Sequence, residues 1–415
     1  MIEACEQQDL CETTTDAGRG LRVAPVASLE SLSGEWNSLA PDRPFSRYEW
    51  LAPWWRRLGT NQRLFTLGVW NESDELVAIA PWRIERLPIG GRVVRFLGSG
   101  AACSDYATLL CRDEGGAAPA AIARWLTGPA RHCWDLLELT GVAADEPSVE
   151  RLVAALGALG HRVHARPDQS CWRVELPGNW EQFLGGLSAS RRQRTRTLWR
   201  RAFANSRARI VNVTNVAELE QCFGILVDLH TRRRRSLGQP GCFADPDMAA
   251  FLREAAEGML AAGRLRMFWL ELEGRPIAVE FGFSGGDVVH YYQGGFDPDA
   301  AAERPGWLCF AASLRMAIDQ GYRSFDFLRG DEAYKASWGA TARPMIEYRV
   351  SARRSVAQLR LSLWRAGVEI KRLARERLRA WIPRDRAGGR PSAWRTREDE
   401  AGGAELPPPP RLRTS

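Results

Sequence analysis

Two carboxylates in the C-terminal half stand where a side chain could take a proton. Asp326 lies inside the apolar run from Ser324 to Leu328, where a carboxylate is costly unless it has a partner. Glu280 lies in an expected strand, and its neighbours on the same strand face are small, which leaves the space that a general base in a groove needs. The alternative for Glu280 is a solvent-facing side chain on a half-exposed sheet.

Lys335 stands out because the sequence has only one other lysine, Lys371, and every other basic side chain is an arginine. A lysine supplies a compact ammonium that a planar guanidinium cannot replace where a point charge or a proton donor is needed. Lys335 therefore becomes a candidate catalytic residue, and the alternative is a surface lysine without a role.

A strand, a glycine-bearing loop, a helix and a second strand follow one another between Val288 and Leu328. Gly294 and Gly295 are expected to end the first strand, and Pro305 opens a helix that Gly321 closes. The free N–H groups at the helix N-terminus, with Arg304 beside them, suit a phosphate or pyrophosphate. The alternative is a strand–helix–strand crossover that only packs. The candidate cofactor-binding residues are Gly294, Gly295, Arg304, Gly306 and Trp307.

Two other segments could contact a substrate. The expected helix from Ser188 to Asn205 carries Arg191, Arg192 and further arginines, which either form a solvated charged face or bind phosphate through their planar forks. Asp105 stands between a glycine turn and an expected strand, where ligand contacts are common, but the same residue could cap a local turn.

Several short motifs carry a family resemblance. Pro305-Gly306 opens the helix, Phe325-Asp326-Phe327 precedes Gly330, and Glu332-Ala333-Tyr334-Lys335 follows. In these residues the chain resembles the GNAT-type acetyltransferases of the CelD-like family, which are linked to cellulose and exopolysaccharide biosynthesis. The order of elements is also similar to that of the Fem-type peptidyltransferases, which pair two GNAT-like domains. The resemblance covers Ser188–Tyr348 well and Phe45–Leu110 loosely.

The resemblance implies acyl-CoA, in particular acetyl-CoA, as the co-substrate. It implies that Glu280 or Asp326 helps to deprotonate the acceptor, and that Tyr334 or Lys335 stabilises the oxyanion or the leaving thiolate. The sequence departs from the family at one place, because it lacks the Gln/Arg-x-x-Gly-x-Gly/Ala loop before the cofactor helix. Cofactor binding at Arg304–Trp307 is therefore inferred from position alone. In both families an arginine-bearing helix opens the second domain, as here.

Alternating strands and helices predict a mixed α/β fold of two tandem GNAT-like domains with a basic C-terminal helical tail. Hairpins are expected from Leu64–Trp70 with Leu76–Arg83 and from Leu265–Glu273 with Pro276–Ser284, and a last strand is expected from Trp338 to Val350. The expected divisions are a disordered leader (1–20), a first domain (21–170), a second domain (171–350) and a tail (351–415).

The net charge of +7 belongs to the tail. Residues 351–415 contain sixteen Arg and Lys against seven Asp and Glu, a balance of +9, so the rest of the chain carries −2. A DNA-binding fold is therefore not expected. The amphipathic segment from Val356 to Ile382 could dock on the protein or on an anionic membrane.

Nine scattered cysteines without a C-x-x-C pair indicate a reduced, cytoplasmic protein, and the histidine spacing supports no metal site.

These observations favour an acyltransferase that moves an acyl group from acyl-CoA to an amine or hydroxyl of a small-molecule or saccharide acceptor. The acceptor would belong to exopolysaccharide, cellulose or cell-envelope biosynthesis, and Asp105, Arg191 and Arg192 would help to hold it. One alternative is a Fem-type transferase that takes an aminoacyl group from charged tRNA. Another is a non-catalytic GNAT-like module that binds a membrane synthase through residues 351–415, at the inner face of the membrane.

Overall fold

The computed structural model describes residues 14–16, 20–60, 62–88, 91–112, 116–354, 356–359 and 362–363. Residues 1–361 form one compact unit, and of the second unit, residues 362–415, only Ser362 and Leu363 are described. Most of the expected leader and of the expected basic tail therefore lies outside the described residues. Within the expected leader, Thr14–Asp16 forms strand β1, which pairs with β2 (Leu21–Pro25).

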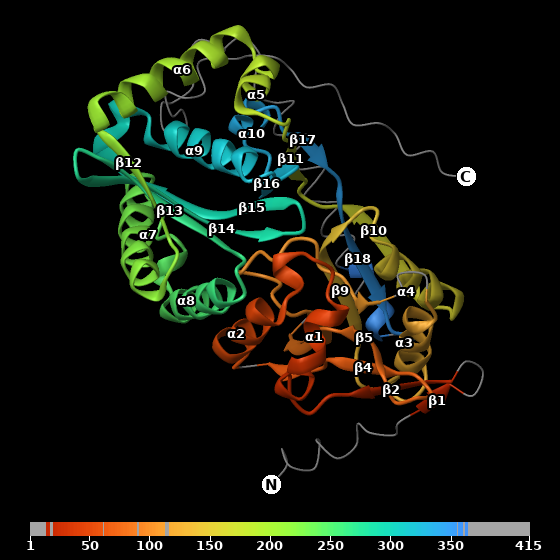
Figure 1. Ribbon diagram of the computed structural model, residues 1–415. Coiled ribbons are helices and arrows are strands. Elements are labelled where there is room, and N and C mark those ends of the chain that lie inside the picture. Colours follow the sequence, from red (N-terminus) through yellow and green to blue (C-terminus); the bar gives the residue numbers. More distant parts are fainter. Residues whose placement is uncertain are drawn as a thin grey trace. The chain divides into compact units, whose positions relative to one another are not determined.

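The N-terminal lobe contains two sheets whose strands connect through short loops and two crossover helices (Figure 1). Its strands are β2 (Leu21–Pro25), β3 (Arg63–Leu64), β4 (Leu67–Trp70), β5 (Leu76–Ala80), β6 (Trp82–Leu87), β7 (Gly91–Phe96), β8 (Leu110–Cys111), β9 (Leu136–Ala143) and β10 (Arg162–Pro167). Its helices are α1 (Ser33–Leu39), α2 (Tyr48–Leu58), α3 (Ala118–Thr127) and α4 (Pro147–Ala158), with 3-10 turns at Glu30–Leu32 and Pro44–Ser46.

The C-terminal lobe is built on one seven-stranded sheet in the order β12-β13-β14-β15-β16-β11-β17. Its strands are β11 (Cys171–Glu175), β12 (Ala208–Asn212), β13 (Leu265–Leu272), β14 (Arg275–Gly285), β15 (Val288–Phe296), β16 (Ser324–Arg329) and β17 (Thr341–Arg343). Its helices are α5 (Trp180–Gly186), α6 (Ala189–Phe203), α7 (Val216–Ser236), α8 (Pro246–Ala261), α9 (Pro305–Asp319) and α10 (Ala333–Ser337), with 3-10 turns at Ala204–Ser206, Cys242–Ala244 and Pro298–Glu303. Helices α7 and α8 lie on one side of this sheet, and α9 and α6 lie on the other (Figure 1).

The two lobes repeat one order of elements. In each, a strand is followed by two helices, by antiparallel strands, and then by a parallel strand pair joined through a helix. The parallel pairs are β7 with β9 across α3 and β15 with β16 across α9. Such crossovers require a helix because parallel strands cannot be joined by a tight turn. The expected mixed α/β fold with two such lobes is confirmed.

The end of the expected second domain (171–350) pairs with the N-terminal lobe. The segment expected to be one strand, Trp338–Val350, splits at Pro344, whose missing N–H interrupts a strand ladder. Strand β17 stays in the C-terminal sheet, whereas β18 (Met345–Ser351) pairs with both β9 and β10 of the N-terminal lobe. The chain therefore returns to the first lobe after completing the second. Similarly, the expected strand Leu76–Arg83 divides at Pro81 into β5 and β6, which belong to different sheets.

Gly294 and Gly295 lie inside β15, and the expectation that they end the strand was wrong. Both pair with β14, opposite Glu280 and Val279 respectively. A Cβ on Gly295 would lie 2.5 Å from the backbone nitrogen of His230 in α7. Gly295 is therefore required by close packing of α7 on β15, whereas a Cβ on Gly294 would meet the Tyr291 hydroxyl and the carbonyl of Val279.

We expect Gly295→Ala to lower the free energy of unfolding by about 2 kcal/mol, because the added methyl group meets the backbone of α7 and something must shift. The measurement is urea unfolding. Gly224→Ala is the matched control, since a Cβ at that position of α7 meets nothing within 4 Å. It should raise stability by up to ~1 kcal/mol through helix propensity. Equal effects of the two changes would contradict the packing argument.

Candidate active site between the two lobes

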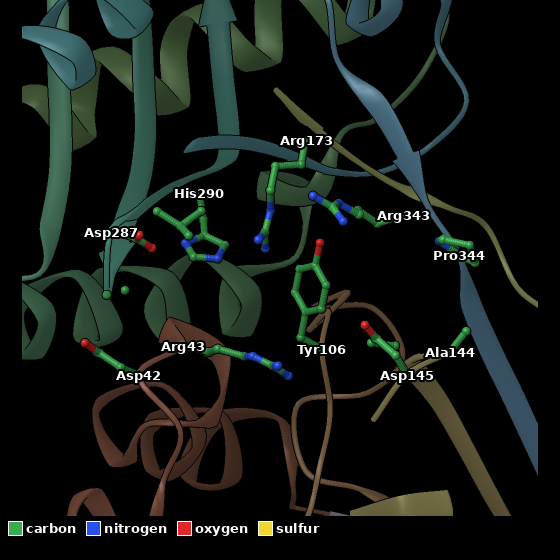
Figure 2. Close-up of a pocket in the computed structure, with 14 residues that line it drawn as sticks. Asp42, Arg43, Tyr106, Ala144, Asp145, Arg173, Asp287, His290, Arg343 and Pro344 are labelled. Carbon is green, nitrogen blue, oxygen red and sulfur yellow. The ribbon is translucent and has the colours of Figure 1, made fainter. Parts of the chain in front are cut away.

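A pocket of about 450 Å³ lies where the two lobes meet, and we call it the junction pocket. Its lining includes Arg43 and Tyr106 from the N-terminal lobe and Arg173, Asp287, His290 and Arg343 from the C-terminal lobe. Figure 2 shows Arg173, His290 and Tyr106 converging on its centre from β11, from β15 and from the loop before β8. The Tyr106 ring has guanidinium groups near it, with the Arg43 and Arg173 carbons 5.6 and 5.8 Å from its centroid.

Asp326 lies behind this pocket and is fully buried on β16. Its carboxylate accepts hydrogen bonds from the Tyr106 hydroxyl (2.5 Å), Arg173 Nε (3.1 Å) and the backbone N–H of Leu328 (2.8 Å). The expectation that Asp326 needs partners is confirmed. These bonds fix the orientation of Tyr106, a residue 220 positions away in the sequence.

His290 is the neighbour of Asp326 across the parallel strand pair, and it was not among the residues predicted to take part in the site. Its side chain is buried, and its Nδ1 has no hydrogen-bond partner among the described residues. Burial lowers the pKa of His290 to about 4, while the nearby Asp326 charge opposes that shift. His290 is therefore a neutral imidazole at pH 7. The signal that could have identified it is the one used for Asp326, a polar side chain inside an apolar strand.

Asp105 does not open into the junction pocket. It is buried and accepts hydrogen bonds from the backbone N–H and from Nε of Arg329, at 3.1 and 2.5 Å. The residue thus forms a bridge between the lobes. Arg191 and Arg192 lie on α6, on the α9 side of the sheet, and Arg192 Nη1 donates to the carbonyl of Gly185 (3.2 Å). The structure therefore does not bring the three predicted substrate-binding residues together.

The parallel strands β15 and β16 separate along the side of the sheet where the cofactor is predicted to bind. Their pairing stops at His290 and Asp326, although both strands continue beyond these residues. Helix α9 begins nearby at Pro305, after Arg304 in the left-handed conformation at φ 55°, and no side chain caps it. Gly306 lies in its first turn with Phe296 as its nearest neighbour. Trp307 is not free, because its indole N–H donates to Thr195 of α6 (3.0 Å) and its ring packs on Trp338.

Tyr334 lies on α10, and its ring stacks on Phe310 of α9 with centroids 5.2 Å apart. Phe327 and Tyr291 pack against the same Phe310 ring. This aromatic group stands where the two strands separate. Burial raises the pKa of the Tyr334 phenol, so the phenol is protonated at neutral pH and can donate its proton.

Lys335 is buried, and carbonyl oxygens surround its ammonium group. Nζ donates to the carbonyls of Leu328 (3.1 Å), Arg329 (2.6 Å) and Gly330 (3.0 Å), and it forms an ion pair with Glu332 (2.9 Å). An ammonium has three protons, so these four acceptors use all of them. The geometry favours a role in holding the bend at the end of β16, where Leu328 adopts φ 58°, over the predicted contact with an oxyanion.

Glu280 lies on the face of the sheet opposite to the junction pocket. Its carboxylate accepts a hydrogen bond from Ser313 of α9, whereas Asp326 and His290 face the N-terminal lobe. The two carboxylates predicted to share one role as the base therefore open to different parts of the molecule. Burial raises the pKa of Glu280 to about 8, against smaller opposing effects of Ser313 and Arg266.

Within the described residues, no group of three or more His, Cys, Asp and Glu side chains is arranged to hold a metal ion. The same part of the chain contains no helix that combines the length and the apolar character of a membrane span.

Comparison with known families identifies one segment of the chain. Residues 189–336 match the model of the Acetyltransf_6 family, an acetyltransferase (GNAT) domain. The matched residues run from α6 into α10. The C-terminal lobe therefore contains a GNAT-type acetyltransferase domain, the class of domain expected from the sequence. No curated protein matches the sequence of this chain.

Solved structures similar to this one cover both lobes. FemX shares 10% identity, covers 78% of this chain and 96% of its own, and superposes with a TM-score of 0.56. The C-terminal domain of a putative lysylphosphatidylglycerol synthetase from Agrobacterium fabrum shares 14% identity, covers 82% of this chain and 97% of its own, and has a TM-score of 0.50. At these identities the likeness shows the fold.

Proposed function

We propose that the protein transfers an acyl group, acetyl in the simplest case, from acyl-CoA to an amine or hydroxyl of an acceptor bound in the junction pocket. The observation that carries this proposal is the end of strand pairing at His290 and Asp326 inside a GNAT-type domain. His290 lines the junction pocket, and β15 continues from it to Phe296, after which the predicted donor side begins at the start of α9. A donor and an acceptor could therefore meet beside His290 and Asp326.

On the acceptor side, neutral His290 takes the proton from the attacking amine or hydroxyl. The imidazole can take that proton because its Nδ1 has no partner among the described residues and the ring is uncharged at pH 7. Asp326 stabilises the imidazolium that forms, since its negative charge favours the protonated ring. Tyr106 and Arg173, both bonded to Asp326, hold that carboxylate and shape the wall of the pocket.

On the donor side, the free N–H groups of α9 and the exposed Arg304 hold the pyrophosphate of acyl-CoA. Gly306 leaves room for that group close to the helix. Tyr334, which the raised pKa of its phenol keeps protonated, donates a hydrogen bond to the leaving thiolate. The thioester carbon gains the bond to the acceptor, loses the bond to sulfur, and the acceptor proton ends on His290.

The acceptor we propose is a saccharide or another hydroxyl-rich molecule of exopolysaccharide, cellulose or cell-envelope biosynthesis. The junction pocket presents Arg43, Arg173 and Arg343 together with Asp42, Asp145 and Asp287. This mixture of fork-shaped donors and carboxylate acceptors suits a ligand with many hydroxyl groups, because each hydroxyl both donates and accepts. The proposed acceptor also follows from the resemblance to the CelD-like family.

Titration calorimetry with acetyl-CoA tests the donor. We expect saturable binding that Gly306→Asp weakens about tenfold or more, because the new carboxylate repels the pyrophosphate at the helix N-terminus. Gly224→Asp adds the same charge at an open position on α7 and should bind like the wild type. Absence of binding by any acyl-CoA at millimolar concentration would reject the proposal.

The ligands that the purified protein retains distinguish acyl-CoA from the rival donor, a charged tRNA. Helix α6 exposes Arg194, Arg196 and Arg200, which could bind the phosphates of a charged tRNA. Mass spectrometry of ligands retained through native purification should find CoA if the proposal holds. Retained tRNA would favour aminoacyl transfer, and a retained synthase without either donor would favour the non-catalytic alternative.

A further inference from the structure

A second cavity, of about 270 Å³, lies across the sheet from the junction pocket, between β13, β14 and α9. We call it the Glu280 cavity. Its lining combines apolar side chains, among them Met267, Phe268, Val289 and Met316, with polar ones, which include Arg266 and Gln320 besides Glu280 and Ser313. Neither residue takes part in the reaction proposed for the junction pocket.

Glu280 differs from the other buried carboxylates in the part of the chain that the structure describes. Each of the others has an arginine partner: Asp105 with Arg329, Glu146 with Arg43, Asp297 with Arg232, Asp326 with Arg173, and Glu347 with Arg166 and Arg349. Glu280 forms no such ion pair within the described residues. One oxygen accepts from Ser313, and the other, Oε2, is buried without a hydrogen-bond partner among them. A buried polar atom left in this state costs stability.

The positive charge of Arg266 lowers the pKa of Glu280, but the Arg266 guanidinium forms no hydrogen bond or ion pair with Glu280 in the described part of the chain. Its guanidinium lies over the ring of Tyr322, 5.1 Å from the centroid. The other titratable groups whose charges interact with Glu280 are Tyr291 of β15, Cys309 of α9 and Tyr334 of α10, all of them neutral at pH 7 because burial raises their pKa. The cavity thus combines an unpaired acidic group with an apolar wall and with space for a ligand.

We propose that the Glu280 cavity binds a small primary amine as its ammonium ion, with Glu280 as the counter-ion and the apolar wall around the alkyl chain. A monoamine fits these surroundings because it supplies the one positive charge that the other buried carboxylates obtain from arginine. Binding requires Glu280 to ionise. Since burial raises the pKa of its carboxyl to about 8, amine binding at pH 7 releases a proton, and affinity rises with pH until Glu280 is ionised without the ligand.

The test uses n-butylamine as the probe and 1-butanol as its uncharged counterpart, titrated into the full-length protein by calorimetry between pH 6 and 9. We expect butylamine to bind at least about tenfold more tightly than butanol at pH 8, because a hydrogen bond to a charged group is stronger than one between neutral groups. Affinity should fall as the pH decreases from 8 to 6. Equal binding of the two probes, or no binding, overturns the proposal.

Four variants locate the binding. Glu280→Gln should remove the preference for the amine and its pH dependence, while Ser313→Ala should weaken amine binding less. Glu271→Gln, on the neighbouring strand β13, removes a carboxylate that already has Arg209 as its partner and should leave butylamine binding unchanged. His290→Gln should also bind butylamine normally, which separates this cavity from the reaction site. Persistence of the preference in Glu280→Gln would contradict the assignment.

Discussion

Replacement of His290 by glutamine should lower the turnover of acyl transfer by ~100-fold or more, because the acceptor loses its general base. The change keeps a polar side chain of similar size on β15, so binding of acyl-CoA at α9 should remain close to that of the wild type. The measurement is steady-state turnover with acetyl-CoA and an acceptor, together with calorimetry of the donor. Unchanged turnover would remove His290 from the mechanism.

His230→Gln provides the matched control. His230 is also buried, also has an unpartnered Nδ1, and burial likewise lowers its pKa to about 4, but it lies on α7 against Phe243 and Cys242. Both changes remove a buried neutral imidazole, so both should lower stability to a similar degree. Only His290→Gln should abolish turnover, and equal losses of turnover would indicate a structural cause.

The pH profile gives an independent test of His290. The neutral imidazole is the active form, and burial places its pKa near 4, so activity that depends on it should persist through pH 5 and disappear as the pH falls through about 4. An exposed histidine would lose its function near pH 6.5. Loss of activity around that higher value, with the fold intact, would point to a different base.

Lys335→Met should lower the free energy of unfolding by ~3 kcal/mol or more. The substitution removes the ammonium that pairs with three backbone carbonyls, and it leaves these carbonyls without their charged donor. Urea unfolding measures this loss. Glu332→Gln is the control: it removes an acidic partner whose side chain is 59% exposed, so a change below ~1 kcal/mol is expected.

The same variant separates the two roles of Lys335. If its ammonium contacts an oxyanion, Lys335→Met should keep its stability and lose turnover by ~100-fold or more. If its ammonium holds the bend at the end of β16, the loss of stability should dominate, and Lys335→Arg should not restore it, because a planar fork does not fit the space among three carbonyls. A stable but inactive Lys335→Met would return this residue to the catalytic site.

The sequence predicted those elements whose signals are local. Pro305 and Gly321 delimit α9 closely, and the hairpin of β13 and β14 follows from its alternating residues and its glycine turn. Gly295 misled the prediction because the reason for a glycine there lies in α7, more than fifty residues earlier in the chain. Likewise, the partner strands of β18 could not be read from its own residues, since strand pairing is decided by distant segments.

The candidate site was predicted in part for the same reason. A carboxylate in an apolar strand is costly unless it has a partner, so Asp326 could be predicted as a site residue from the sequence of its own strand. Its partner Tyr106 was not, because a loop in the other lobe provides it. Lys335 was singled out by its rarity in the sequence, which marks a special position but does not distinguish a catalytic ammonium from one that holds backbone carbonyls.

The position of β18 has a consequence for the order in which the protein is made. In the N-terminal lobe this strand lies between β9 and β10, yet it is synthesised after the whole second lobe. Until β18 is synthesised, the backbone N–H and C=O groups along one edge of β9 and of β10 lack their partner strand. Such edges are templates for pairing with other chains. Folding of domains in order of their synthesis, the usual protection of multidomain chains, does not apply to this lobe. Until β18 is synthesised, the N-terminal lobe therefore presents strand edges at which other chains could pair.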